Sequence, residues 1–156
     1  MPSWSRGSGV GRTIAAIQSE KPGIKAGLVG LGCGTLAAYG RPEDKFRFYE
    51  INSDVIEQAQ THFDFLKNSP SQNGISLGDA RLVLESEEPQ QFDLLVLDAF
   101  SGDAVPTHLL TEEAFQLYQT HLNDDGVIAI HISNRYFDLR PVIDAAAEKL
   151  KLQTLT

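Results

Sequence analysis

Short apolar runs alternate with amphipathic stretches along most of the chain. The runs predict buried strands at 28–31, 46–51, 75–77, 94–97 and 127–130, each bounded by Gly, Asp or Asn. Continuous apolar runs are typical of strands that are covered on both faces, and such strands form parallel sheets. The pattern therefore predicts a mostly parallel sheet.

The segments between these runs have helical spacing. Val10, Ile14 and Ile17 predict a leading helix, and a short helix is expected to end at Gly40. Further helices are expected after the cap Asn52 or Ser53, from the cap Thr111 to Leu122, and from the cap Asp138 to Leu150. Residues 70–74 are expected to form a loop.

Alternating strands and helices with right-handed crossovers predict an α/β, doubly wound sheet with helices on both faces. Residues 1–22 are expected to be an N-terminal segment with the leading helix, and 23–156 the α/β domain. Residues 152–155 have the composition of a further strand, so the fold is expected to be truncated at its C-terminal strands.

Composition and charge exclude several classes of protein. The 156 residues are 42% hydrophobic and 22% charged, which is globular composition for one core. The net charge of −8 would repel nucleic acid and attract a cationic small molecule, although acidity can also serve solubility alone. With no apolar run near the roughly 20 residues of a membrane span, we expect no membrane insertion and a cytoplasmic location.

Nine of the 13 glycines fall within the first 40 residues, and three of them follow the first predicted strand. In the turn Gly30-Leu31-Gly32-Cys33-Gly34, a nucleoside could lie against the backbone at a helix N-terminus. Glu50 comes 20 residues after Gly30, at the end of the second strand, where a carboxylate can accept both ribose hydroxyls. A dehydrogenase would also place an acid there, so the glycines do not exclude nicotinamide binding, but the sequence has no recognisable hydride-transfer constellation downstream, which weighs against it.

Acidic residues also follow the third and fourth strands. Asp79, before Ala80, could accept a hydrogen bond from an adenine amino group or cap the next helix. Asp98 and Asp103 flank one strand-end loop, where two carboxylates can hold a cation or deprotonate an ammonium group. Asp98 could instead only cap a helix, and the sequence leaves both interpretations open.

Histidine and cysteine placement predicts no metal site. The single cysteine, Cys33, cannot form a disulfide within the chain and is interpreted as a pocket-wall residue. His62 and His121 are expected at the surface of helices. His131 ends the fifth strand and could face the pocket.

Four motifs together resemble the spermidine synthase-like (polyamine aminopropyltransferase-like) branch of the S-adenosylmethionine-dependent methyltransferase superfamily, which has a Rossmann-like sheet. They are residues 29–36, 48–52, 77–80 and 92–100. The later segments 103–111 and 131–136 look most like bacterial spermidine synthase-like domains, some of which are fused to a transporter-like membrane region. The resemblance therefore implies a nucleoside-binding domain that could be the soluble part of a longer, membrane-associated protein.

The resemblance also implies roles for single residues. Glu50 would hold the ribose, and Asp79 with Ala80 the adenine. The glycine turn would hold the tail of S-adenosylmethionine or decarboxylated S-adenosylmethionine as co-substrate, with no metal. Asp103 would be the base, with Asp98 beside it. The cofactor-binding set is then Gly30, Gly32, Cys33, Gly34, Glu50, Asp79, Ala80 and Asp98.

Three functions stay open at this point. Aminopropyl transfer to an amine leads, with a polyamine as the expected partner and a homodimer as the expected assembly. Spermidine synthases usually carry an acid where Cys33 stands, so methyl transfer from S-adenosylmethionine is a second reading. A non-catalytic nucleoside-binding domain is the third.

Overall fold

The structure is a computed structural model, and it describes residues 9–99, 106–132 and 138–154. Within these residues, one sheet contains the strands β1 Lys25–Val29, β2 Lys45–Glu50, β3 Gln72–Leu77, β4 Phe92–Leu97 and β5 Leu122–Ile130. The helices are α1 Gly9–Glu20, α2 Ser53–Thr61, α3 Phe65–Asn68, α4 Ala80–Ser86, α5 Glu112–His121 and α6 Arg140–Leu150, with 3₁₀ turns η1 Thr35–Tyr39 and η2 Thr107–Leu109.

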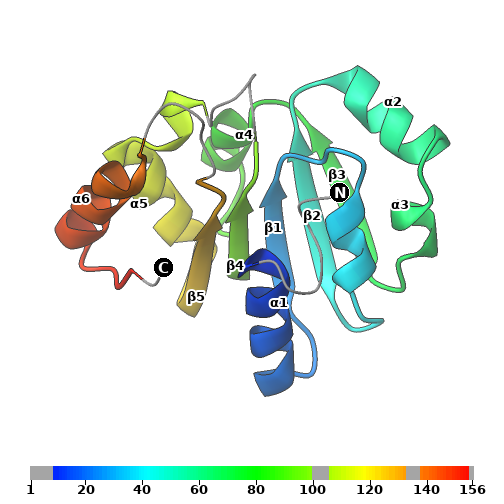
Figure 1. The fold of residues 1–156 in the computed structure, drawn as a ribbon, viewed down its shortest axis with the longest axis horizontal. Helices are drawn as coiled ribbons and strands as arrows, with labels where there is room; N and C mark the ends of the chain where they lie inside the picture. Colours follow the sequence, from blue (N-terminus) through cyan, green and yellow to red (C-terminus); the bar gives the residue numbers. More distant parts are fainter. Residues whose placement is uncertain (1–8, 100–105, 133–137, 155–156) are drawn as a thin grey trace.

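All paired strands are parallel, in the order β3-β2-β1-β4-β5 (Figure 1). The chain builds the sheet outward from β1 through β2 to β3, and then returns to the other side of β1 with β4. Ala26 is therefore paired with Phe46 on one side and with Leu94 on the other. This reversal leaves a crevice at the carboxyl ends of β1 and β4, where open α/β sheets bind ligands.

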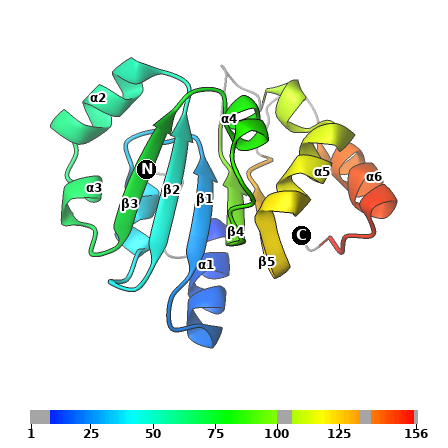
Figure 2. The same ribbon diagram turned by 180° about the vertical axis from the view of Figure 1, so that it is seen from behind.

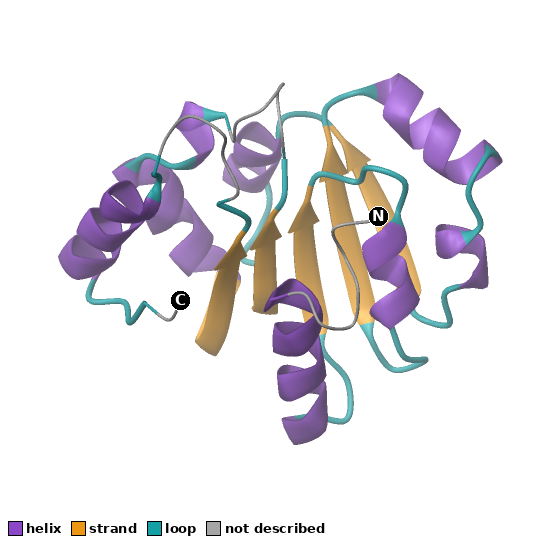
Figure 3. Cartoon of the chain, viewed as in Figure 1, coloured by secondary structure: helices purple, strands orange, loops and turns teal. Residues whose placement is uncertain are grey.

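Both faces of the sheet are covered by helices, as Figures 1 and 2 show from opposite sides. The helices α1 and α2 and the turn η1 cover one face, and α4 and α5 cover the other; Figure 3 shows the same layers by element type. In β4, Leu94 and Val96 pack with the first group, whereas Leu95 and Leu97 pack with the second. This alternation confirms the predicted doubly wound α/β fold.

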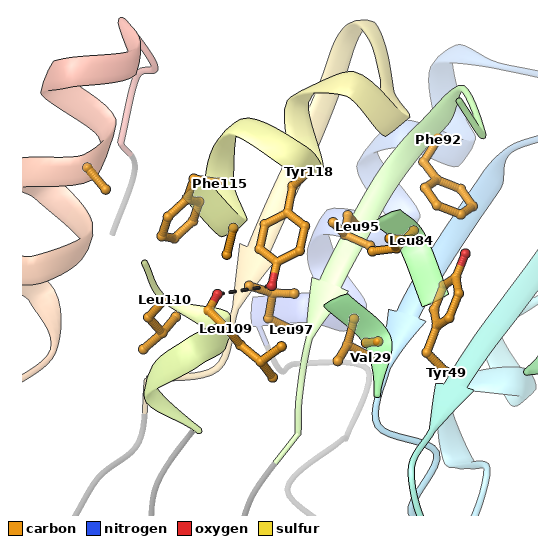
Figure 4. Packing of buried hydrophobic residues seen from close by; sticks show 13 residues of the cluster. Val29, Tyr49, Leu84, Phe92, Leu95, Leu97, Leu109, Leu110, Phe115 and Tyr118 are labelled. Carbon is orange, nitrogen blue, oxygen red and sulfur yellow. Dashed lines mark hydrogen bonds between the residues drawn. The ribbon is translucent and has the colours of Figure 1, made fainter. Parts of the chain in front are cut away.

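The core on the α4–α5 face is tied to η2 by a hydrogen bond (Figure 4). The Tyr118 hydroxyl donates to the Leu109 carbonyl oxygen over 3.0 Å, and the Phe115 ring meets the Tyr118 ring edge to face. The hydrogen bond to Leu109 attaches η2 to α5, and His108 and Leu109 of η2 lie beside the carboxyl ends of the strands.

Several predicted boundaries were wrong by a few residues. β1 begins at Lys25 and ends at Val29, because Gly30 takes a φ of +96° that ends the strand. β3 begins at Gln72, inside the predicted loop, where it pairs with β2. β5 begins at Leu122, with an irregular register opposite β4.

The end of the chain also differs from the prediction. Leu139, not Asp138, is the N-cap of α6, and Asp138 instead accepts a hydrogen bond from the Arg140 N–H. Lys151 takes a left-handed conformation that ends α6 and turns the Leu152 N–H back to the Ala147 carbonyl. Residues 152–154 form no strand.

Candidate functional site

The carboxyl ends of all five strands contribute residues to a cavity of about 780 Å³. Each predicted strand-end carboxylate that the structure describes borders this cavity, namely Glu50, Asp79 and Asp98. Asp103 lies outside the described residues. The full lining is Val29, Gly30, Gly32, Tyr49, Glu50, Ile51, Asn52, Val55, Gly78, Asp79, Ala80, Asp98, Ala99, Pro106, His108, Leu109 and His131.

The turn after β1 brings bare backbone to the cavity. The Gly30 N–H donates to the Tyr49 carbonyl over 2.9 Å, which extends the ladder between β1 and β2 by one residue. A Cβ atom at Gly30 would lie 2.6 Å from the Asp98 carbonyl oxygen, so only glycine fits between the two strand ends. Gly32 also lines the cavity, whereas Cys33 and Gly34 do not border it.

The Glu50 carboxylate is held in place by two backbone donors. Leu31 N donates to Oε2 and Asn52 N donates to Oε1, each over 3.0 Å, and the residue is 9% exposed. An ionised carboxylate has about four acceptor positions, so each oxygen can accept one further hydrogen bond. The arrangement can therefore receive a pair of vicinal hydroxyl groups without rearranging.

Beside Glu50, the side chain of Ile51 gives the cavity an apolar surface. It is 68% exposed although it lines the cavity. An exposed aliphatic side chain next to buried carboxylates suits the flat face of an aromatic ring.

Asp79 is the N-cap of α4. Its Oδ1 accepts from Arg81 N over 2.9 Å and from Leu82 N over 3.2 Å, while Oδ2 lies 2.8 Å from His108 Nε2. Burial alone would raise the pKa of Asp79, but the Leu82 N–H and the His108 ring outweigh it, so the pKa lies below its usual value. The capping interpretation is thus confirmed, and the adenine contact stays a prediction.

Asp98 pairs with His131 across the ends of β4 and β5. Asp98 Oδ1 lies 2.9 Å from His131 Nδ1, and the two side chains are 15% and 21% exposed. Burial raises the pKa of Asp98, and the His131 ring only partly offsets this effect. Asp98 is therefore a largely buried acid with an imidazole partner at the cavity wall.

The histidines were the least well predicted residues. His131 does line the cavity, and His108, which lines it too, was not singled out. The available signal for His108 was its place in the loop after β4. The surface prediction for His121 was wrong: it is 2% exposed, accepts from Gln90 N at Nδ1 and lies 3.0 Å from the Leu84 carbonyl at Nε2, because α5 packs this face against the core.

Among the described residues, no three His, Cys, Asp or Glu side chains are grouped so that they could hold a metal ion. In the same residues, no helix has both the length and the apolar character needed to cross a bilayer.

Three curated relatives match most of the chain, although no family model matches it. A polyamine aminopropyltransferase from Vibrio vulnificus is 33% identical over 107 residues, which are 65% of this chain and 35% of that protein. An N-terminal histidine N-methyltransferase from Emericella nidulans is 32% identical over 127 residues, which are 76% of this chain and 22% of that protein. The chain thus spans about a third or less of the length of these relatives.

Solved structures share the fold. Human methyltransferase-like protein 13 in complex with SAH aligns over 81% of this chain and 62% of that one, with a TM-score of 0.68 and 19% identity. A probable spermidine synthase from Corynebacterium glutamicum aligns over 76% of this chain and 43% of that one, with a TM-score of 0.65 and 24% identity.

The parallel sheet with a cavity at its carboxyl edge is the Rossmann-like fold that these solved methyltransferase and spermidine synthase structures share. In sequence, the chain is similar to two polyamine aminopropyltransferases, the second of them a probable one from Bifidobacterium longum at 24% identity, and to an N-methyltransferase, which supports a spermidine synthase-like domain of the S-adenosylmethionine-dependent methyltransferase superfamily. The resemblance found in the sequence motifs is therefore confirmed.

Proposed function

We propose that this domain binds S-adenosylmethionine or its decarboxylated form in the carboxyl-edge cavity and transfers an alkyl group from it. One observation carries the proposal: the Glu50 carboxylate is fixed by Leu31 N and Asn52 N beside the bare backbone of Gly30, at the wall of a cavity of about 780 Å³. This combination suits a nucleoside whose ribose hydroxyls donate to Glu50 and whose tail lies against the backbone of the turn after β1.

The proposed roles follow the strand ends. Glu50 accepts the ribose hydroxyls, and Asp79 and Ala80 hold the adenine. The glycine turn holds the tail of the nucleoside, with Asp98 opposite. Gly30 and Gly32 line the cavity, and Cys33 and Gly34 complete the same turn outside the cavity lining. In support, six of these residues line the same cavity, namely Gly30, Gly32, Glu50, Asp79, Ala80 and Asp98.

The leading reaction is aminopropyl transfer to an amine. The amine loses a proton to a base, and its nitrogen then bonds to the propyl carbon next to the sulfonium. The carbon–sulfur bond breaks, its electron pair stays on sulfur, and a thioether nucleoside leaves. Asp103 and Asp98 are the proposed catalytic carboxylates, and positioning of the two substrates supplies most of the rate.

The proposed acceptor is a polyamine, because the net charge of −8 and the carboxylates at the cavity attract a polycation. The expected homodimer and cytoplasmic location stay predictions.

Methyl transfer is the second candidate. One curated relative is named as an N-methyltransferase, and Cys33 replaces the acid that spermidine synthases usually carry in the turn. An acid there would repel the carboxylate that S-adenosylmethionine retains and its decarboxylated form lacks.

Calorimetry with S-adenosylmethionine, its decarboxylated form and methylthioadenosine separates these candidates. Tighter binding of the decarboxylated form supports aminopropyl transfer, and tighter binding of S-adenosylmethionine supports methyl transfer. Binding of methylthioadenosine at least as tightly as both, with no transfer to a panel of amines, supports a non-catalytic domain. Absence of binding by all three contradicts the proposed function.

A further inference from the structure

Two histidine–carboxylate pairs border the cavity, and they differ in what the carboxylate does. In the pair His108–Asp79, the carboxylate also caps α4 through Oδ1, and the His108 side chain is 49% exposed. In the pair His131–Asp98, both side chains are more than three-quarters buried. The second pair lies beside Gly30, where the proposed function places the tail of the nucleoside.

The backbone fixes both members of the second pair. The His131 N–H donates to the Leu97 carbonyl over 3.0 Å, and the Asp98 N–H donates to the Val29 carbonyl over 2.9 Å. Both residues therefore continue strand ladders, and their side chains start from positions that the sheet determines. Such placement on strand ends holds a functional group more accurately than a free loop would.

We propose that the His131 imidazole, aligned by Asp98, is the group that accepts the proton from the acceptor amine. The proposal rests on the proposed function, and it assigns a catalytic role to a residue that the sequence motifs did not. In this refinement of the proposed function, Asp98 acts as a positioning residue instead of a catalytic carboxylate, and His131 takes the place of Asp103 as the proposed base.

The proposed chemistry depends on the tautomer of the ring, which sets the direction of the hydrogen bond between His131 Nδ1 and Asp98 Oδ1. When Nδ1–H donates to the Asp98 carboxylate, the lone pair of the neutral ring is on Nε2. Nε2 takes one proton from the ammonium form of the acceptor, the ring becomes an imidazolium, and Asp98 balances its charge. The amine nitrogen then forms the new carbon–nitrogen bond as the carbon–sulfur bond breaks, and the imidazolium later releases the proton to water.

An imidazole suits this step because the neutral ring has one nitrogen that can accept a proton, and the Asp98 carboxylate beside it can balance the charge of the protonated ring. The raised pKa of Asp98 is consistent with its burial behind the ring. The other titratable groups that border the cavity in the described residues include Glu50, Asp79 and His108. Their variants must be compared before a pH profile is assigned to His131.

The first test is ¹⁵N NMR of the imidazole in the wild-type protein, which needs no substrate. We expect the neutral His131 ring to carry its proton on Nδ1, and D98N to change that tautomer. A ring protonated on Nε2 at neutral pH overturns the proposal, because Nε2 could then not accept a proton.

The second test compares three variants with the wild-type protein in calorimetry and turnover assays. H131N keeps a side-chain donor near Asp98 but has no base, so we expect turnover about 10²–10⁴-fold lower with unchanged nucleoside affinity. H62N changes an exposed histidine at the end of α2 and is the matched control. D103N tests the other carboxylate, and we expect a smaller loss than in H131N.

These outcomes separate the two proposals. If the wild-type protein transfers a group and H131N does so equally fast, His131 is not the base, although the proposed function stands. A loss confined to D103N likewise shows that His131 is not the base. If the wild-type protein binds none of the three nucleosides, the proposed function fails, and the role of His131 fails with it.

Discussion

At the scale of single residues, each carboxylate of the site has a distinct environment. Glu50 accepts two backbone hydrogen bonds, Asp79 caps a helix and contacts His108, and Asp98 is buried against His131. The same residue types at the same sheet edge can therefore take different parts in binding and chemistry.

Glu50→Ala is expected to weaken nucleoside binding by roughly 1.5–3 kcal/mol, the range for hydrogen bonds to a charged group. The reason is that both ribose hydroxyls lose their acceptor. Calorimetry with S-adenosylmethionine measures the change, and Glu57→Ala, at an exposed position on α2, is the control. Equal affinities for the wild-type protein and a folded Glu50→Ala variant would contradict the assignment.

Asp79→Ser separates the two functions of Asp79. Serine is a good N-cap, so the melting temperature should change little, while the carboxylate that reaches His108 and the proposed adenine is lost. We expect weaker nucleoside binding in calorimetry at a nearly constant melting temperature. If the melting temperature falls and the affinity survives, Asp79 serves only as a cap.

At the scale of elements, the turn between β1 and η1 depends on close contact between two strand ends. Gly30 and Gly32 both have positive φ, but only at Gly30 would a Cβ meet another atom, the Asp98 carbonyl oxygen. Both glycines therefore provide a positive φ, and Gly30 in addition leaves room for the Asp98 carbonyl.

Gly30→Ala is expected to be more destabilising than Gly32→Ala. A positive φ costs an alanine roughly 1–2 kcal/mol at either position, and the collision with the Asp98 carbonyl adds to that cost only at Gly30. Urea unfolding of the two variants measures the difference. Equal losses would show that the strand ends can move apart without cost.

At the scale of the whole molecule, a buried carboxylate at the opposite edge of the sheet joins three segments. Asp44 is fully buried and accepts from Ile24 N over 3.0 Å, from Arg41 N over 2.7 Å and from the Gln18 side chain over 2.7 Å. These bonds attach α1 and the start of β1 to the loop before β2. The strands β1 and β2 thus have the Asp44 hydrogen bonds at their amino ends and the cavity at their carboxyl ends.

Asp44→Asn is expected to lower the free energy of unfolding by about 3 kcal/mol at neutral pH, because the partly buried Arg41 guanidinium loses its partner. Burial alone would raise the pKa of Asp44, but hydrogen bonds from the Arg41 side chain and from Ile24 N outweigh it, so the pKa lies below its usual value. The stabilisation is complete above the pKa of an unfolded aspartate and is lost as pH falls through the lowered pKa.

Urea unfolding at neutral pH and at several values below about pH 4, the usual pKa of an aspartate, tests both statements. The wild-type protein should lose more stability on acidification than Asp44→Asn, with the exposed Asp124→Asn as control. An identical acid dependence in all three proteins would show that Asp44 does not carry this effect.

The sequence by itself determined the order of strands and helices, the sheet class and the strand-end carboxylates Glu50, Asp79 and Asp98. These features depend on local apolar runs, caps and spacing, which are properties of neighbouring residues. The first residues of β1 and β5 could not be predicted from the sequence. Pairing with β4 extends both strands toward the N-terminus, beyond their most apolar residues.

Only the tertiary structure decided which side chains meet. His131 reaches Asp98, His108 reaches Asp79, and His121 is buried between α4 and the loop before β4. Each of these contacts joins residues about 30 positions apart, and no local pattern encodes the direction of a side chain across such a separation. The parallel sheet brings His131 to Asp98 and His108 to Asp79 because it places the carboxyl ends of successive strands at one edge, regardless of the length of chain between them. His121 lies at the opposite edge, where β4 and β5 begin.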